Sequence, residues 1–188
     1  MKIILIITLL TVGINLNAQK VVSIEASGNL ESPNPCGCIE LAEVTNENNP
    51  ADIMAGMEKC IDLKQYKKAA RLFAIAGVYG KYDTYRVKDN SAHQALSVLN
   101  LNIFEKLDES TQKQLMKIFK HEFKTGSKEL NNICQLIQKV GIPKYYPRYM
   151  IQHGIQSFME SEGKGLVEEF DSSVSWDLAM KEYLHCGK

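Results

Sequence analysis

The sequence lacks an excess of charge of either sign, and it has very little arginine. Lysine and arginine together number 22, aspartate and glutamate also number 22, and only Arg71, Arg86 and Arg148 are arginine. A chain without a long block of like charge gives no expectation of nucleic-acid or anionic-membrane binding through a broad field. So few arginines also leave few donors for bidentate recognition of phosphates or carboxylates. We therefore expect no nucleic-acid partner.

Short catalytic and cofactor motifs are also missing. The chain contains no Gly-x-Ser-x-Gly elbow, no phosphate-binding loop and no dinucleotide fingerprint, so no cofactor is expected. His121-Glu122 lacks the second histidine of a zinc-protease helix, His153 has no evident partner, and His185 is nearly terminal. The sequence does not exclude a catalytic pair of carboxylates, because such a pair assembles from residues that are distant in sequence.

The most hydrophobic stretch lies at the start of the chain. Met1-Lys2 gives a short cationic beginning, residues 3–12 are almost entirely apolar, and Ala18 offers a small residue before a cut at Gln19. An apolar run of ten residues is about half of the roughly twenty that a membrane-spanning helix needs. The layout predicts a secretory signal peptide over residues 1–18 and an exported product, periplasmic or extracellular, without stable membrane insertion after cleavage.

Five cysteines remain after that cut, and export changes what they predict. In an oxidising compartment an even subset is expected to pair, which leaves one thiol over. Cys36 and Cys38 are one residue apart and would rarely bridge each other, so each is expected to staple its segment to a distant point. Cys60 and Cys186, each on an apolar stripe near a helix end, are the favoured partners of Cys36 and Cys38. Cys134, in the middle of a helix, is predicted to be the buried cysteine that stays unpaired.

A metal site and a redox centre are the alternatives for Cys36-Gly37-Cys38. Zinc sites usually show a second close pair of Cys or His, and His185-Cys186 stands alone at the far terminus. Redox folds favour Cys-x-x-Cys beside a strand–helix pattern, which this sequence does not show. Structural disulfides are therefore favoured, and no metal ligand is predicted.

Three parts follow one another along the chain. The predicted signal peptide is followed by an extended lead-in over residues 19–49, with a possible short strand at 21–24, and then by a helical domain over residues 50–188. After Pro50 the apolar residues recur with a period of 3.6 almost to the end. This pattern predicts an all-α, single-domain bundle of seven helices that disulfides staple.

The expected helices begin and end at recognisable signals. Ser91 and Gln94 fit a capping box, and the small, apolar second helix is expected at the centre of the core. The seven helices are predicted from Pro50 to Ile61, from Tyr66 to Gly80, from just after Ser91 to Leu107, from Asp108 or Ser110 to Phe123, from the cap Ser127 to Val140, from Pro147 to about Phe158 and from Ser175 to Cys186.

One helical pair carries a resemblance to a known repeat. The residues are Tyr66, Ala69, Phe73, Ala76, Gly77 and Gly80. Through them residues 50–80 resemble a single helical hairpin of the tetratricopeptide or Sel1-like type, in which aromatic and small residues let one hairpin pack into the next. No second copy occurs near a spacing of 34, although a solenoid needs roughly three units. The resemblance implies a protein-interaction scaffold without an extended groove.

Residues 79–94 form the densest polar cluster. Tyr82 and Tyr85 beside Arg86 indicate a recognition patch, since tyrosine and arginine dominate interface hot spots. In the alternative interpretation Arg86 pairs with Asp83 or with Asp89 and the tyrosines fill the junction between helices.

The same cluster holds the best catalytic candidates. His93 lies four residues after Asp89, close enough on a helical turn for the aspartate to orient the histidine as an acid or base. The alternative is that Asp89 or Ser91 caps a helix.

A second aromatic group surrounds Arg148. Its tyrosines either bind a partner or plug a helix junction with their hydroxyls toward water. Together the candidate binding residues are Tyr82, Tyr85, Arg86, Tyr145, Arg148 and Tyr149.

These observations favour an exported helical domain that binds another protein, as an adaptor, an inhibitor or an immunity-type partner of a secreted toxin. A small exported hydrolase using His93 with Asp89 is the second hypothesis. A passive component of the cell envelope fits the composition as well.

Overall fold

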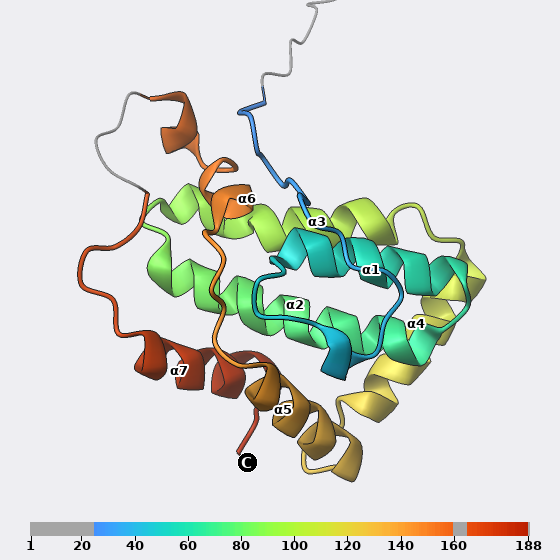
Figure 1. Cartoon of the computed structure of the whole chain (residues 1–188). Helices are drawn as coiled ribbons and strands as arrows, with labels where there is room; N and C mark the ends of the chain where they lie inside the picture. The colour runs from blue at the N-terminus through green and yellow to red at the C-terminus, as the bar shows by residue number, and fades with distance from the viewer. Residues whose placement is uncertain (1–24, 160–164, 188) are drawn as a thin grey trace, which may run out of the picture.

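A computed structural model describes residues 25–159 and 165–187, and within these ranges the chain forms helices and no strand (Figure 1). The predicted all-α class is confirmed. The predicted signal peptide and the possible strand at 21–24 lie outside the described residues. The α-helices are α1 (Pro50–Asp62), α2 (Tyr66–Arg86), α3 (Ala95–Phe104), α4 (Glu109–Glu122), α5 (Lys128–Val140), α6 (Arg148–Ile151) and α7 (Ser172–Leu184). Three 3-10 turns accompany them: η1 (Leu41–Glu43), η2 (Asn90–Gln94) and η3 (Ile155–Phe158).

Side chains next to the helix ends fix where several helices begin. The Asn49 side chain accepts from the Asp52 amide at 2.9 Å and Asp52 accepts from the Asn49 amide at 3.0 Å, so a capping box opens α1. Asp108 accepts from the Thr111 amide at the start of α4, and Ser127 does the same for α5. These contacts satisfy backbone donors that the first turn of a helix leaves free.

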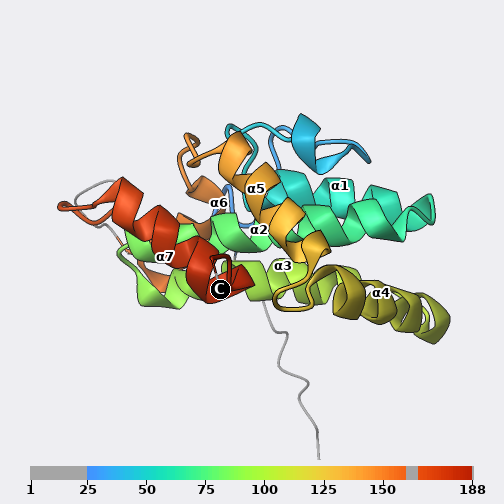
Figure 2. The same cartoon turned by 90° about the horizontal axis from the view of Figure 1, so that it is seen from below.

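Helix α2 occupies the centre of the bundle, as its small and apolar residues predict. It contacts α1, α4 and α7, and most of its side chains between Ala69 and Tyr82 are buried (Figures 1 and 2). A Cβ atom on Gly77 would overlap the Tyr183 ring, so the missing side chain lets α7 cross close to α2. With α1 it forms the predicted helical hairpin; its relation to a repeat family stays a prediction.

Helix boundaries differ from the prediction most clearly at four places. Helix α2 runs to Arg86 rather than ending at Gly80. The expected helix over 147–158 divides into α6 and η3, because Gly154 breaks it where the chain packs onto Asp89. The expected Ser91–Gln94 capping box is absent, since Asp89 accepts the Ser91 amide and α3 begins only at Ala95. The last helix starts three residues early, at Ser172, because Asp171 caps it by accepting from the Val174 amide.

The disulfides correct the predicted pairing. Cys38 bonds to Cys60, which is one of the two partners expected for the Cys36–Cys38 segment. Cys186 bonds to Cys134 rather than to that segment, so the expected partner of Cys186 is wrong and Cys134 is not the spare thiol. The free cysteine is Cys36, which was expected to pair. Cys60, Cys134 and Cys186 were expected on apolar helix faces, but the pairs depend on which faces meet after the helices pack.

Cys36 is half-buried against α1. Its thiol lies 3.4 Å from the Asp52 carbonyl oxygen, and a Cβ on Gly56 would overlap its sulfur. Burial, and then the charge of Asp52, raise the pKa of Cys36 to about 11. The thiol therefore stays protonated at neutral pH and serves as a packing group.

Candidate functional site

The tyrosines and the arginine singled out in the sequence meet around one buried carboxylate, Asp83 of α2. Asp83 Oδ2 accepts hydrogen bonds from the hydroxyls of Tyr145, at 2.9 Å, and Tyr149, at 2.8 Å. Arg86 Nε donates to the other oxygen, Oδ1, at 2.7 Å. Asp83 is 0% exposed. These four residues, called here the Asp83 network, fasten the segment around α6 onto α2.

Arg86 completes the network as a buried cation between two rings. Its guanidinium carbon lies 5.1 Å from the centroid of the Tyr82 ring and 4.9 Å from that of Tyr145. Its Nη2 also approaches Asp83 Oδ1 at 2.7 Å, but in a geometry that makes no hydrogen bond. The alternative in which Arg86 pairs with Asp83 is thereby confirmed.

Burial sets the protonation behaviour of the network. It raises the pKa of Asp83 even though the Arg86 charge and the two tyrosine hydroxyls act in the opposite direction. Burial, followed by the charge of Asp83, raises the pKa of Tyr145 and Tyr149 well above the ordinary value. Both tyrosines therefore remain neutral donors at physiological pH.

Two of the tyrosines predicted to bind a partner are buried. Tyr82 is 2% exposed and Tyr149 is 1% exposed, and the Tyr82 hydroxyl lies 3.1 Å from Ser172 Oγ. A partner cannot reach either ring without unfolding this part of the protein. The binding roles predicted for Arg86 and Tyr145 stay predictions, but both residues already bind Asp83.

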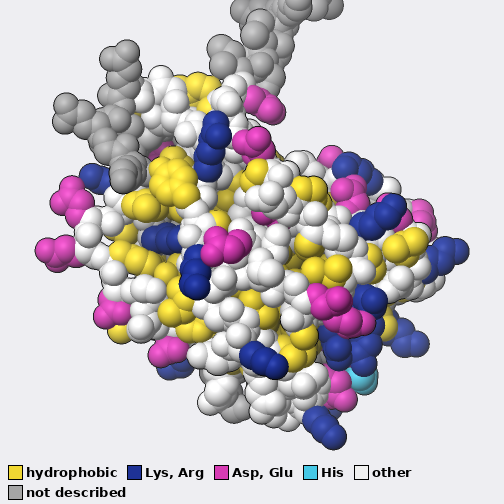
Figure 3. All heavy atoms as spheres, in the orientation of Figure 1, with side chains coloured by type: hydrophobic (Ala, Val, Ile, Leu, Met, Phe, Trp, Pro, Cys, Tyr) yellow, Lys and Arg dark blue, Asp and Glu magenta, His cyan; other side chains and the backbone are white. Residues whose placement is uncertain are grey.

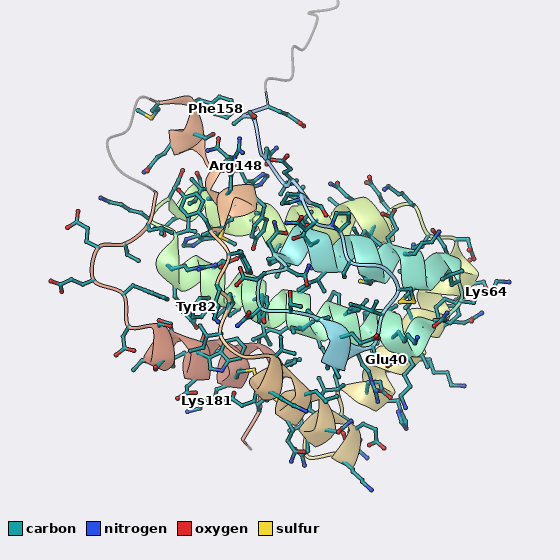
Figure 4. All side chains as sticks on the ribbon, viewed as in Figure 1. Glu40, Lys64, Tyr82, Arg148, Phe158 and Lys181 are labelled. Atoms are coloured by element: carbon teal, nitrogen blue, oxygen red, sulfur yellow. A yellow bond between two sulfur atoms is a disulfide. The ribbon has the colours of Figure 1, made fainter. Side chains whose placement is uncertain are left out.

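Tyr85 and Arg148 lie nearer the surface and join neighbouring segments. The Tyr85 hydroxyl donates to Glu182 Oε2 of α7 at 2.7 Å. Arg148 Nη2 donates to the carbonyl oxygen and hydroxyl of Ser27, at 3.2 and 3.3 Å, and so holds the N-terminal segment on α6 (Figure 4). Their binding roles also stay predictions.

Asp89 and His93 do not form the predicted acid–base pair. Asp89 Oδ1 accepts from the amide and hydroxyl of Ser91, at 2.9 and 2.7 Å, and caps η2. His93 Nε2 lies 2.9 Å from the Val87 carbonyl oxygen. The alternative in which Asp89 caps a helical turn is the one that the structure contains.

A surface that the sequence analysis missed lies next to Asp89. Ile155, Phe158 and Met159 are 67%, 55% and 64% exposed, and they fall within five consecutive residues. We call this group the apolar tip. Figure 4 shows Phe158 at the end of the molecule away from Lys64. Isolated exposed apolar residues are ordinary, but a contiguous group is typical of a contact site.

Hydrogen bonds from η2 hold the apolar tip in one conformation. The Ile155 amide donates to Ser91 Oγ and the Gln156 amide donates to Asp89 Oδ2, each at 2.9 Å. Gly154 lies so close to Asp89 and Ala92 that a Cβ atom would overlap them. Asp89, predicted as a catalytic orienter, is therefore an anchor of the tip.

The pKa of Asp89 reflects that anchoring. Partial burial acts to raise it, but hydrogen bonds from Ser91 and the Gln156 amide outweigh burial, and the pKa lies below its ordinary value. The carboxylate is thus ionised, as an anchor for two backbone donors requires.

Comparisons with known proteins give no family. No protein-family model, curated protein or solved structure matches this chain. Within residues 25–159 and 165–187, no three His, Cys, Asp or Glu side chains are arranged to hold a metal ion. No helix in the same ranges is long and apolar enough to cross a membrane.

Proposed function

We propose that this protein is an exported, disulfide-stapled helical domain that binds another protein through the apolar tip. The observation that carries the proposal is the exposure of Ile155, Phe158 and Met159 on a short segment that Asp89 and Ser91 hold by hydrogen bonds. A segment fixed before binding loses less conformational entropy on binding, so its apolar contacts convert more fully into affinity.

The chemistry of the tip describes its partner. Three large apolar side chains without a charge among them would enter an apolar groove and exclude water from it. Polar neighbours such as Gln156 and Ser157 would then lie at the rim. An adaptor, an inhibitor or an immunity-type partner of a secreted toxin would use such a surface.

Site-specific crosslinking tests the proposal. A photoreactive amino acid at position 158 should capture one protein in the native compartment, and capture should disappear when Ile155 and Met159 are both changed to serine. The matched control places the photoreactive residue at Val174, which is 55% exposed on α7. Capture that is equal at the two positions, or that survives the serine changes, would contradict the proposal.

A further inference from the structure

The molecule concentrates positive charge at the end opposite the apolar tip, although the chain has no net charge. Two hollows of about 520 and 550 Å³ lie there, and each is lined by four lysine or arginine side chains against one carboxylate. Figure 3 shows dark blue side chains gathered at the lower right beside a histidine, with magenta acidic side chains among them. The lining cations, called here the basic end, are Lys64, Lys67, Lys68, Arg71, Lys117, Lys120, Lys124 and Lys128, with His121 among them.

Few of these charges are neutralised by the protein itself. Glu122, which is 1% exposed, forms ion pairs with Lys67 at 3.4 Å and with Arg71 at 3.0 Å. Glu40 forms an ion pair with Lys68 at 3.3 Å. In the part of the chain that the structure describes, no ion pair reaches the remaining lysines. These are Lys64, Lys117, Lys120, Lys124 and Lys128.

The lysines of α4 form a row, in which Lys113 is paired with Glu109 and the others have no ion pair among the described residues. Lys113, Lys117 and Lys120 follow one another at spacings of four and three residues, and Lys124 comes four residues later just past the helix. This spacing places them along one face over about 16 Å. Met116 is 49% exposed within the row, and Leu63 is 51% exposed beside Lys64. Figure 2 shows α4 at one edge of the molecule, below the ends of α1 and α2.

The side chains of the basic end favour an anionic bilayer over single phosphate groups or single-stranded nucleic acid as the partner. The basic end uses lysine, a point charge, where bidentate recognition of single phosphates would use arginine. Tyr66 and His121 are the two rings that line the hollows, one in each, so a run of stacked single-stranded bases has little platform. A cluster of lysines with exposed apolar side chains, on a helix at the edge of the molecule and on a neighbouring turn, is the pattern that attracts negatively charged bilayers.

We propose that the basic end docks this protein onto an anionic lipid surface. The lysine row lies along the headgroup phosphates, and Met116 and Leu63 enter the interface between headgroups and acyl chains. The contact is peripheral and reversible, because it uses surface charge and two exposed apolar side chains. It is independent of the proposed partner of the apolar tip, which remains free at the far end.

Vesicle sedimentation tests this docking. The probe is a vesicle of 30% phosphatidylglycerol and 70% phosphatidylcholine, compared with pure phosphatidylcholine, at 50 and 500 mM salt. Changing Lys117, Lys120, Lys124 and Lys128 to glutamine should lower the partition coefficient several hundredfold, since each lysine contributes roughly fivefold near an anionic surface. High salt should weaken binding of the parent protein, because the screening length becomes shorter.

The control variant changes four exposed lysines elsewhere, Lys88, Lys139, Lys144 and Lys181, to glutamine. It has the same net charge and should bind the anionic vesicles like the parent within about tenfold. Equal losses in the two variants, equal binding to neutral vesicles, or no binding at 50 mM salt would each overturn the proposal. Binding to polygalacturonate or duplex DNA without binding to vesicles would also overturn it, in favour of a soluble polyanion.

Discussion

The apolar tip and the basic end differ in how the chain builds them. The tip uses three side chains within five residues, and its position depends on hydrogen bonds from Asp89 and Ser91. The basic end draws its charges from α2, α4 and the start of α5, and the Cys38–Cys60 disulfide lies four residues or fewer in sequence from Glu40 and Lys64. Figure 4 places Phe158 and Lys64 at opposite ends.

Because they are built differently, the two surfaces should be sensitive to different changes. Apolar contact requires close packing, so the tip depends on the geometry of its anchors. Electrostatic attraction acts over about 10 Å at 0.1 M salt, so the basic end depends on the number of its charges more than on their exact positions. Changes to anchors should therefore affect the tip, and changes to salt or charge should affect the basic end.

The largest effect is expected from Asp83→Ala. The change leaves the Arg86 guanidinium buried without its counterion and two tyrosine hydroxyls without their acceptor. We expect the free energy of unfolding to fall by about 3–5 kcal/mol in chemical denaturation. In hydrogen exchange, peptides from α6 to η3, on the tip side, should lose more protection than peptides of α4.

Asp177→Ala is the matched control, because Asp177 is exposed on α7. It should change stability by no more than about 0.5 kcal/mol. A loss below about 1 kcal/mol for Asp83→Ala, or equal exchange at the two ends, would show that the network does not hold the tip side.

Removal of the Cys38–Cys60 disulfide should have the next largest effect. The two cysteines are 22 residues apart, and opening a loop of that length costs about 3 kcal/mol in the chain-entropy model. We expect a Cys38→Ser, Cys60→Ser protein to unfold at lower denaturant concentration and to exchange faster at η1, beside the basic end. Faster exchange at η3 with none at η1 would reverse the comparison.

A smaller and more local effect is expected from Asp89→Ala. The change removes the acceptor of the Gln156 amide and one partner of Ser91, at a cost of about 1–2 kcal/mol. Chymotrypsin should then cleave after Phe158 faster than in the parent. Asp108→Ala, which removes the cap of α4, is the control with a similar loss of stability and no faster cleavage at the tip. Equal cleavage in both variants would refute the anchoring role.

The smallest effect is a change with pH. The pKa of Asp89 is lowered in the folded protein, so its contribution is complete above the ordinary value of 3.8 and is lost as pH falls through the lowered value. The NMR shift of the Gln156 amide should therefore stay constant from pH 7 to about 4 and change only below 3.8. A midpoint above 3.8 would contradict the hydrogen bonding described for Asp89.

Local signals predicted the helices well, because caps and apolar periodicity act over a few residues. Pro50, Asp108 and Ser127 mark helix starts in the sequence and in the structure. The sequence pattern also placed Tyr82 and Arg86 in one polar cluster. It did not predict that Asp83 is buried and that the cluster therefore faces the interior. Direction depends on the packing of α6 against α2, which periodicity does not specify.

The two proposed surfaces escaped prediction for different physical reasons. The tip was hidden by the expectation of one helix over 147–158, and Gly154 was the signal that could have divided it. The basic end was hidden because Lys67 and Lys117 are 50 residues apart, and charge counted along the chain does not show which helices lie together. The partner of Cys186 was mispredicted for the same reason.

Vesicle partition of two variants tests the separation of the ends most directly. The account predicts that Phe158→Ser with Met159→Ser partitions onto 30% phosphatidylglycerol vesicles as the parent does. Glutamine at Lys117, Lys120, Lys124 and Lys128 should lower the partition several hundredfold. Loss of vesicle binding in the tip variant, or its retention in the lysine variant, would contradict the account.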